Sequence, residues 1–449
     1  MDTKELLKSI IRTFQANPLP QDIIKRDIEL PIDSGAVISV IGSRRAGKTY
    51  LVLETIQQLL NKGVPKDNII YINFEDERLI DLKTSDLDSI LQAYRELYPD
   101  NNLSEAYLFL DEIQNIEGWE KFVRRAHESI TKRVYITGSN SKLLSTEIAT
   151  ELRGRTLPYE VFPLSFSEFL RFRDIPYSPN DRYVPSVRAK IVAALDEFLL
   201  YGGFPEVLSR DQVLKTKTLQ EYLNVMITND LVKRYDIKSP KTVQFFVRQV
   251  LNSNAKEFSV NKIYNSFQSV GLKISNTTLY DYMEYVQTIY LAFVLNKYVY
   301  SDRLKEQTSK KIYAIDSGLY NAFNTQHLDD KAKLLENAIF LQIYRNTKEV
   351  SFYKDEYSEC DFIISDQGKP KQAIQACFSM KSDDTRKRET RGLVRACKAL
   401  NFTEGTILTF DQQEQFEQDG ITITVTPVWL YFLDDALGKK WKICIQGKN

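Results

Sequence analysis

The sequence contains few of the residues that most often bind transition metals. Its 449 residues include only two histidines and four cysteines. The cysteines show neither a CxxC motif nor the Cys/His spacing of a zinc site. We therefore expect no zinc centre, and in a cytosolic protein we expect free thiols at Cys360, Cys377, Cys397 and Cys444.

Long apolar runs, net charge and internal repeats are also missing. No apolar stretch approaches the roughly 20 residues that a membrane-spanning helix requires, so no membrane partner is expected. The first twenty residues lack the apolar core and cleavage site of a signal peptide and instead predict a short amphipathic helix. Together these features predict a cytoplasmic protein. Basic and acidic residues both number 60, so net charge does not indicate nucleic acid, although a local basic patch stays open.

Short apolar segments alternate with helical patterns in the first third of the chain. After an N-terminal helical arm, residues 1–35, this alternation predicts an α/β core over residues 36–165. Strands connected through helices imply a parallel sheet with helices on both faces. The predicted strands are residues 36–42, 69–74, 106–112, 134–138 and 157–162.

The rest of the chain predicts three further parts. Residues 166–245 show helical patterns, with a turn at 201–207. Residues 246–316 predict three helices, the third capped by Ser275, and then a β-hairpin, an order typical of a winged helix. The segment 317–449 returns to mixed α/β.

A phosphate-binding loop follows the first predicted strand. The residues GSRRAGKT fit G-x-x-x-x-G-K-[ST] and lie between an apolar strand and an amphipathic helix. Backbone N–H groups in such a loop, and the start of the helix, bind the phosphates of ATP or ADP. Lys48 is expected to reach the β and γ phosphates, and the Thr49 hydroxyl to ligate Mg²⁺. The residues assigned to the nucleotide are Gly42, Ser43, Arg44, Arg45, Ala46, Gly47, Lys48, Thr49 and Tyr50.

Polar residues at the ends of later strands complete the predicted site. Asp111 is expected to hold Mg²⁺, and Glu112 to act as general base toward the attacking water. Ser139 or Asn140 is expected to sense the γ-phosphate, with a helix N-cap as the alternative. For two further pairs of residues, the sequence does not decide between a functional role and a solvated position on the surface. These are Glu75 with Asp76, which could position water, and Arg153 with Arg155, which could stabilise transition-state charge in their own site or in a neighbour's.

A series of motifs resembles one prokaryotic family. In order they are GSRRAGKT, INFEDERL, LFLDEIQ, ITGSNSKLLS, LRGR, PLSFSEFL and GGFPEV, and the resemblance extends from about residue 20 to residue 430. The chain resembles the AAA+-related P-loop ATPases often called the archaeal ATPase family. The resemblance implies Glu112 as the base, Ser139 or Asn140 as the sensor and Arg155 as a candidate sensor or arginine finger. It also implies a winged helix followed by a restriction-endonuclease-like domain over 317–449.

The last domain departs from the pattern of an active nuclease. Glu336 and Asp361 match the first two acidic positions, but the Glu-x-Lys position reads Gln375-Ala376-Cys377, and cysteine cannot replace a cationic lysine. Lys381 and Lys387 lie on a polar segment where solvation is expected. We therefore predict a degenerate, nuclease-inactive centre formed by Glu336, Asp361 and Gln375.

The sequence of the predicted winged helix does not identify its binding partner. Asn276, Thr277 and Thr278 could contact bases, whereas Asp281 and Glu284 add negative charge to the same helix. A DNA-binding role and a protein-packing role are equally supported. The wing residues expected to contact phosphates in the first case are Arg303, Lys305, Lys310 and Lys311.

Three functions compete at this point. The first is Mg²⁺-dependent ATP hydrolysis that drives a conformational change coupled to DNA, a protein partner or a second copy of the chain. The second is a regulatory switch that binds ATP or ADP and turns over slowly. The third is a DNA-binding protein with metal-dependent nuclease activity.

Overall fold

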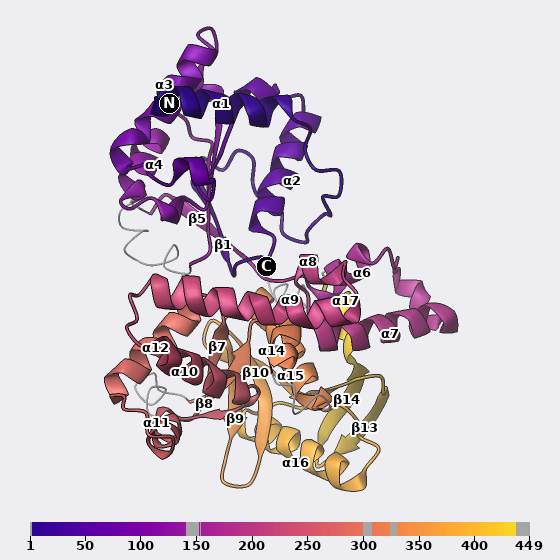
Figure 1. Ribbon diagram of the computed structural model, residues 1–449. Coiled ribbons are helices and arrows are strands. Elements are labelled where there is room, and N and C mark those ends of the chain that lie inside the picture. Colours follow the sequence, from indigo (N-terminus) through magenta and orange to yellow (C-terminus); the bar gives the residue numbers. More distant parts are fainter. Residues whose placement is uncertain (1, 141–151, 153, 300–307, 324–329, 437–449) are drawn as a thin grey trace. The chain divides into compact units, whose positions relative to one another are not determined.

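The computed structural model describes residues 2–140, 152, 154–299, 308–323 and 330–436. The chain divides into two compact units, residues 1–162 and 163–449 (Figure 1). Three of the four cysteines lie in the described part, where they are buried free thiols as predicted, and Cys444 lies outside it. No helix in the described ranges has the length and apolar character needed to cross a bilayer.

A five-stranded sheet forms the centre of the first unit. All of its strands are parallel, in the order β2-β3-β4-β1-β5. Every residue of β1, β3 and β4 is buried, which explains why these segments are continuous apolar runs rather than alternating ones. The predicted parallel sheet is confirmed. The strands are β1 (Val37–Gly42), β2 (Ile69–Asn73), β3 (Tyr107–Asp111), β4 (Val134–Gly138) and β5 (Thr156–Val161).

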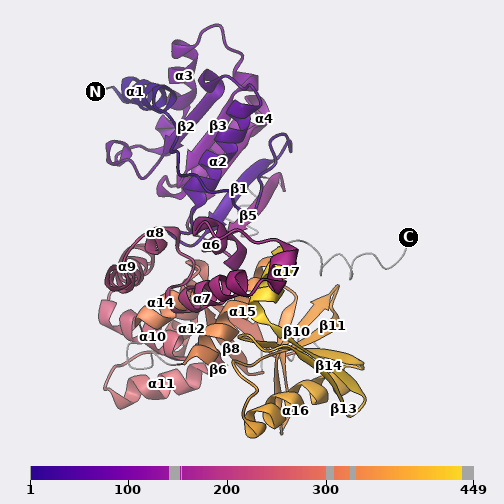
Figure 2. The ribbon, with the colours of Figure 1, turned by 90° about the vertical axis from the view of Figure 1, so that its right-hand side faces the viewer.

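Helices cover both faces of this sheet (Figure 1), and Figure 2 shows α2 in front of the strands. One face packs against α2 (Lys48–Asn61), and the other packs against α3 (Asp88–Leu97) and α4 (Trp119–Ser129). The amphipathic helix α1 (Thr3–Ala16) contacts α3 and lies beside the edge strand β2. There the Gln15 amide donates to the Ile69 carbonyl at 3.1 Å, so α1 is part of the first unit's core.

Helices dominate the first part of the second unit. A buried carboxylate joins two of its segments: Asp316 accepts hydrogen bonds from the N–H groups of Gly203 (2.7 Å) and Leu319 (3.0 Å). A Cβ on Gly202 would lie 1.8 Å from the Asp316 carboxylate, so only glycine fits this turn. The helices are α6 (Phe166–Phe172), α7 (Pro185–Tyr201), α8 (Pro205–Leu208), α9 (Gln212–Val225), a π-helix (Met226–Lys233) and α14 (Ser317–Phe323).

Three helices and a small antiparallel sheet follow in the order expected for residues 246–316. The Ser275 hydroxyl accepts from the Thr278 N–H at 3.0 Å, which confirms the predicted helix cap. The sheet, in the order β6-β8-β7, contains one short strand that the sequence pattern did not predict. The elements are α10 (Pro240–Asn252), β6 (Lys256–Phe258), α11 (Val260–Ser269), α12 (Asn276–Thr288), β7 (Ala292–Asn296) and β8 (Lys310–Ala314).

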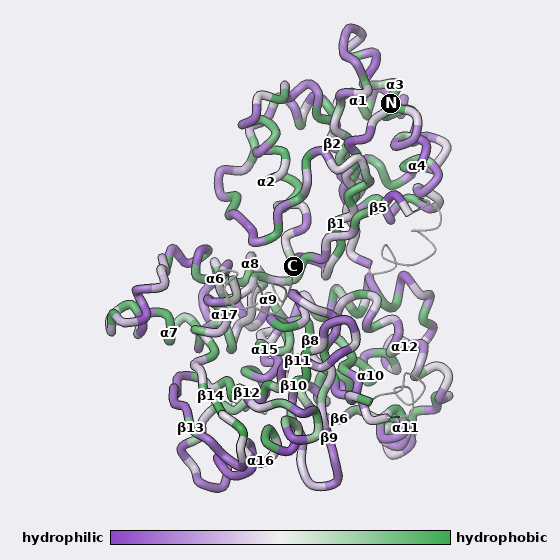
Figure 3. Tube along the Cα trace, turned by 180° about the vertical axis from the view of Figure 1, so that it is seen from behind, coloured by the Kyte–Doolittle hydropathy of each residue, from purple (hydrophilic) through white to green (hydrophobic). Residues whose placement is uncertain are grey.

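A six-stranded mixed sheet forms the C-terminal part of the second unit, in the order β13-β14-β12-β11-β10-β9. Helix α15 (Lys331–Asn346) contacts β8 and β11, and α16 (Asp383–Ala399) covers β10, β11 and β12. Figure 3 shows that the connection between β9 and β10 is hydrophilic. The remaining elements are β9 (Val350–Lys354), β10 (Glu359–Asp366), β11 (Lys369–Ala376), β12 (Glu404–Thr409), β13 (Glu414–Gln418), β14 (Ile421–Pro427) and α17 (Val428–Ala436).

Candidate active site

The phosphate-binding loop connects the central strand β1 to helix α2. Gly42 ends β1 with φ = 150°, and a Cβ on it would lie 2.0 Å from the Val161 carbonyl oxygen on β5. Gly47 (φ = 96°) and Arg45 (φ = 65°) also have left-handed backbone conformations. The loop therefore bends tightly against β5 and aims the first turn of α2 at the carboxyl edge of the sheet, where the predicted cradle belongs.

Lys48 and Thr49 begin α2 and contact Asp111, the last residue of β3, and Glu112, which follows it. The Lys48 ammonium donates to the Ser43 carbonyl at 3.1 Å and pairs with a Glu112 carboxylate oxygen at 3.2 Å. The Thr49 hydroxyl donates to the Asp111 carboxylate at 2.9 Å. The structure thus brings together the four residues to which the sequence assigned phosphate binding, Mg²⁺ ligation and the general base.

The Asp111 carboxylate is buried and accepts hydrogen bonds from neighbouring hydroxyl groups. Tyr71 on β2 donates to one carboxylate oxygen at 2.8 Å, and Thr137 on β4 donates to the other. Burial raises the pKa of Asp111 even though these hydroxyl groups, with Thr49, stabilise its charge. A cation bound beside this carboxylate would compensate the cost of burial, so the position suits a Mg²⁺ ligand.

Glu112 follows with a left-handed backbone (φ = 53°), and its N–H donates to the Thr137 hydroxyl at 2.9 Å. Burial by itself would raise the pKa of Glu112. The Lys48 ammonium and the Gln114 amide outweigh burial and lower this pKa. Glu112 is therefore ionised at neutral pH, which is the protonation state that a general base requires.

The two sensor candidates follow β4, between β1 and β3 in the sheet. Ser139 is buried, and its hydroxyl oxygen lies 3.5 Å from the Gln114 amide nitrogen, while Asn140 is half-buried. At the end of β2, Glu75 pairs with Arg44 of the phosphate loop at 2.7 Å. The Asp76 carboxylate instead pairs with Arg78 in its own turn at 2.6 Å, as expected for a structural residue.

Arg155 lies at the opposite end of the sheet from the phosphate loop. It precedes β5, which runs parallel to β1, and its carbonyl accepts from the Val37 N–H at the start of β1. Six strand residues at about 3.3 Å each place it roughly 20 Å from the loop. Its side chain pairs with Glu128. This placement contradicts a role for Arg155 in its own site. A role toward a neighbouring copy stays a prediction, and Arg153 lies outside the described residues.

Arg26 supports the phosphate loop, although no sequence motif identified it. Its guanidinium is buried and donates to the carbonyls of Ala46 (2.9 Å) and Phe162 (2.8 Å), so it links the loop to the end of β5. Its N–H donates to the Glu54 carboxylate of α2 at 3.2 Å. Arg26 lies in an irregular segment without helical or strand periodicity, so no local pattern indicates this role.

One buried atom of the loop supports nucleotide binding independently of the sequence motif. Ser43 is fully buried, and its hydroxyl oxygen has no hydrogen-bond partner among the residues that the structure describes. A buried hydroxyl without a partner costs about 1–3 kcal/mol. A phosphate oxygen in the loop would accept this hydrogen bond, so the residues present fit a nucleotide.

The second unit brings together the three residues of the predicted degenerate centre. Gln375 donates to the Asp361 carboxylate at 2.7 Å, and Lys311 donates both to Asp361 and to Glu336 on α15. The ammonium of Lys311, on β8, occupies the middle, 2.9 Å from an Asp361 oxygen, 3.1 Å from Glu336 and 2.6 Å from Glu359. Lys311 is 3% exposed. Its expected contact with nucleic-acid phosphates is therefore wrong.

The charges of this cluster are tightly coupled. Burial and the Asp361 carboxylate raise the pKa of Glu336 to about 7. Burial alone would lower the pKa of Lys311, but the carboxylates of Asp361 and Glu336 outweigh it and raise this pKa well above its ordinary value. The described residues contain no group of three or more ligand side chains suited to a metal ion. The cluster thus carries its own cation and does not fit the Mg²⁺ of an active nuclease.

Other residues considered from the sequence lie apart from this cluster. Lys381 and Lys387 are exposed, as expected. Arg303 and Lys305 lie outside the described ranges. The Gln375 amide also donates to Glu389 on α16 at 2.7 Å, and both line a cleft of about 760 Å³.

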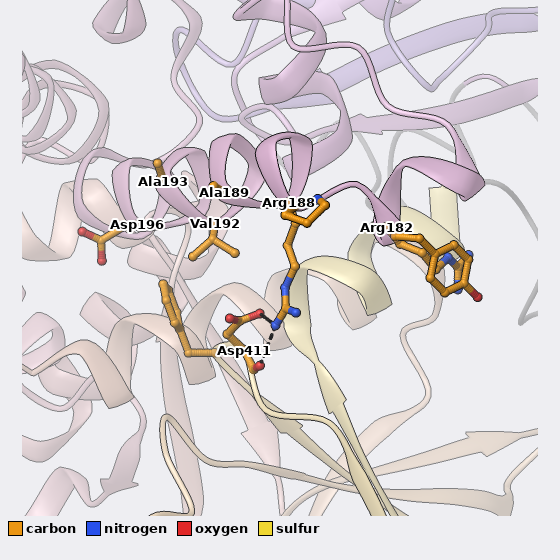
Figure 4. A pocket seen from close by; sticks show the side chains of 10 residues that line it. Arg182, Arg188, Ala189, Val192, Ala193, Asp196 and Asp411 are labelled. Atoms are coloured by element: carbon orange, nitrogen blue, oxygen red, sulfur yellow. Dashed lines mark hydrogen bonds and ion pairs between the residues drawn. The ribbon is translucent and has the colours of Figure 1, made fainter.

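A second cleft of about 780 Å³ lies in the same unit, between α7 and the end of β12 (Figure 4). There Arg188 points to the Asp411 carboxylate and donates to it at 2.7 Å. The remaining lining is largely apolar and includes Val192 and Phe410. None of the residues to which the sequence assigned chemistry lines this cleft.

Comparisons with known proteins agree with the geometry of the first unit. Residues 34–170 match a family model described as an AAA domain, and residues 192–330 match one described as a domain of unknown function, DUF8612. An AAA domain implies ATP binding and hydrolysis, typically with Mg²⁺. The AAA part of the resemblance is confirmed. The second match covers much of the helical part and the three-helix module.

Two relatives match over most of their length. The chain is 35% identical over 445 residues to Uncharacterized protein MJ1544 of Methanocaldococcus jannaschii, covering 96% of each chain. It is 28% identical over 398 residues to an uncharacterized protein of Haemophilus influenzae, covering 89% of this chain and 95% of that one.

Among solved structures, the Walker-type ATPase PABY2304 of Pyrococcus abyssi aligns at 16% identity with a TM-score of 0.41. This alignment covers 64% of this chain and 91% of that one. The Aeropyrum pernix Orc1 protein in complex with DNA aligns at 13% identity with a TM-score of 0.30, covering 71% and 91%. At these scores neither structure decides a function. The sequence identity with MJ1544 does decide the family: the chain belongs to the family of this Methanocaldococcus jannaschii protein, with an AAA-type P-loop ATPase domain at residues 34–170.

Proposed function

We propose that the protein is a Mg²⁺-dependent ATPase in which nucleotide state controls binding of a partner by the second unit. One observation carries the catalytic part of this proposal. The two residues that begin α2 contact the two acidic residues at the end of β3: Lys48 contacts Glu112, and Thr49 contacts Asp111. This arrangement combines phosphate binding, Mg²⁺ ligation and a base within one small buried site.

Each side chain then has a defined task. The loop amides, the Ser43 hydroxyl and Lys48 bind the phosphates, and Thr49 and Asp111 hold Mg²⁺. Bound Mg²⁺ would neutralise part of the phosphate charge. Glu112 accepts a proton from the attacking water.

The Lys48 ammonium pairs with the Glu112 carboxylate at 3.2 Å. A bound phosphate would compete with Glu112 for this ammonium, because charge-assisted hydrogen bonds to phosphate are strong. Phosphate binding thereby frees Glu112 to accept the proton. Base activation is thus coupled to nucleotide binding, and Ser139 or Asn140, after β4, is suited to report the γ-phosphate.

The three-helix module of the second unit is the proposed partner-binding part. Its order of α10, α11, α12 and the β7–β8 hairpin is that of a winged helix. Helix α12 contains no lysine or arginine and carries Asp281 and Glu284. Of the wing lysines that the structure describes, Lys311 is buried and Lys310 is half-buried, so α12 and the described part of the wing offer little positive charge for duplex DNA. We therefore favour a protein partner or a second copy of the chain over DNA.

The C-terminal centre is proposed to be catalytically inactive. Lys311 occupies the position between Glu336 and Asp361 where a cation would bind. Mn²⁺ titration of the nucleotide-free protein, compared with Asp361→Ala, tests this. We expect the two proteins to bind Mn²⁺ equally. Binding that Asp361→Ala abolishes, or nicking of DNA that the same variant abolishes, would show an active metal centre.

Glu112→Gln tests the ATPase assignment. The variant is isosteric and cannot accept the proton, so we expect phosphate release to fall at least about 100-fold while ATP remains bound. Phosphate release and nucleotide retention are measured for both proteins. Wild-type release no faster than that of the variant would favour a slow regulatory switch. Failure of the wild type to retain any adenine nucleotide would overturn the proposal.

Duplex DNA tests the choice of partner. ATPase activity and binding are measured with and without DNA at several salt concentrations, beside the molecular mass with and without nucleotide. We expect no DNA binding with the steep salt dependence of phosphate contacts. DNA binding that weakens steeply with salt, or stimulation of turnover by DNA, would show that the partner is nucleic acid.

A further inference from the structure

Gln114 lies immediately beside the catalytic pair and has no role in the function proposed above. It belongs to a short 3₁₀ turn, Ile113–Asn115, that follows Glu112. Its amide nitrogen donates to one Glu112 carboxylate oxygen, Oε2, and lies 3.5 Å from the Ser139 hydroxyl. Gln114 therefore contacts both the predicted base and a predicted sensor.

The two oxygens of the Glu112 carboxylate have different partners. Oε1 pairs with the Lys48 ammonium at 3.2 Å, and Oε2 accepts from Gln114. The Lys48 contact faces the phosphate loop and is the one that a bound phosphate would weaken. Once it is weakened, Gln114 is the described side chain that still determines the direction of the carboxylate.

The other end of the Gln114 amide is also informative. Its carbonyl oxygen is buried and has no hydrogen-bond partner among the residues that the structure describes. The amide cannot reverse, because its carbonyl would then face the Glu112 carboxylate and repel it. A buried acceptor beside the base and the sensor is suited to a hydrogen bond from a water molecule.

We propose that Gln114 orients both the general base and the attacking water during ATP hydrolysis. Its N–H holds Oε2 of Glu112 so that Oε1 stays directed to the phosphate side, and its carbonyl oxygen accepts one hydrogen bond from the water. The water oxygen attacks the γ-phosphorus and the bond from that phosphorus to the β–γ bridging oxygen breaks. The proton of the water passes to Oε1 of Glu112, and ADP and phosphate leave.

This inference rests on the proposed ATPase function and adds a residue to its site. Its test must distinguish an orienting role of Gln114 from a role that only stabilises the turn. Asn115 in the same turn donates to the Phe74 carbonyl at 3.1 Å, a backbone contact that stabilises the turn. Asn115→Ala is therefore the matched control for loss of a side chain from this turn.

Steady-state ATP hydrolysis and nucleotide affinity are compared in wild type, Gln114→Met, Gln114→Glu and Asn115→Ala. Methionine keeps the size of the side chain and removes both hydrogen bonds, so we expect kcat to fall about 10- to 100-fold. The affinity for ATP should change less than about threefold, because Gln114 has no role in phosphate binding. Asn115→Ala should keep a kcat near that of the wild type.

The separation of kcat from ATP affinity gives a readout that a purely structural role would not produce. A variant that only disturbs the fold of the turn should change both quantities, whereas loss of an orienting residue should lower kcat alone. Gln114→Glu removes the N–H that donates to Glu112 and should therefore lower kcat as Gln114→Met does.

Three results would overturn the inference. One is a wild-type kcat in Gln114→Met. Another is a loss of ATP affinity in step with kcat, which would show that the variant disrupts the whole site. The third is an equal loss of kcat in Asn115→Ala. A wild type without turnover would instead overturn the ATPase function itself, which nucleotide retention and Glu112→Gln test separately.

Discussion

Replacing Lys311 with methionine is the most demanding test of the second unit. The ammonium is 3% exposed and lies within 3.1 Å of carboxylate oxygens from Glu336, Glu359 and Asp361. Methionine fills a similar volume without the charge. The variant therefore leaves the two most buried carboxylates, Glu336 and Asp361, without a cation between them.

The expected loss follows from the burial of these groups. Breaking a buried ion pair by removing one partner typically costs about 3–5 kcal/mol, because an uncompensated charge stays inside. A domain of this size shifts by roughly 2–4 °C in Tm for each kcal/mol. We therefore expect Lys311→Met to lower the melting temperature of the second unit by about 6–20 °C at pH 8.

The loss should depend on pH in a defined direction. The pKa of Glu336 is raised to about 7 in the folded protein, above its ordinary value of 4.5, so ionised Glu336 destabilises the fold as pH rises through this interval. Without Lys311 this pKa should rise further. At pH 5.5 Glu336 is protonated, and the stability deficit of the variant should be smaller than at pH 8.

Thermal unfolding at both pH values, followed by circular dichroism or calorimetry, measures the effect. Lys371→Met, which changes an exposed lysine on β11, in the six-stranded sheet that also holds Asp361, is the matched control and should leave the melting temperature nearly unchanged. Adding Glu336→Gln to Lys311→Met should restore part of the loss. The reasoning is refuted if Lys311→Met is as stable as the control at pH 8, or if its deficit grows on acidification.

Two further changes test other buried groups. Arg26→Ala should destabilise the first unit by about 2–3 kcal/mol and weaken ATP binding roughly tenfold, because the carbonyls of Ala46 and Phe162 lose their donor. Thermal unfolding and nucleotide titration measure both, and unchanged affinity would show that the loop does not need this support. Asp316 has a pKa raised to about 6 by burial, so the wild type should lose up to roughly 3 kcal/mol between pH 4 and pH 7. Urea unfolding across this range should show a smaller loss for Asp316→Asn, and an identical profile would contradict the assignment.

Much of the first unit could be predicted from the sequence because its signals are local. The continuous apolar runs predicted β1, β3 and β4 to within one residue, since a strand buried on both faces needs no polar alternation. The predicted bounds of β2 and of the partly exposed β5 also differ from the structure by one residue at one or both ends. The phosphate loop, with Asp111 and Glu112 at a strand end, is likewise visible in short segments. Local signals were weaker in the second unit. The pattern did not reveal β6 and β13, which are short and largely polar, and it also missed β14.

The partners of the key side chains were decided only by the tertiary structure. Tyr71 and Thr137 reach Asp111 from neighbouring strands, and Arg26 reaches the phosphate loop from an irregular segment. Lys311 could be assigned to a solvated wing from the sequence, but the fold buries it among carboxylates that follow it by 25 to 50 residues. Local periodicity determines where a strand or helix forms, because each residue's backbone preferences act over a few neighbours. Burial and ion pairing depend on segments distant in the chain, so they are determined only when those segments pack together.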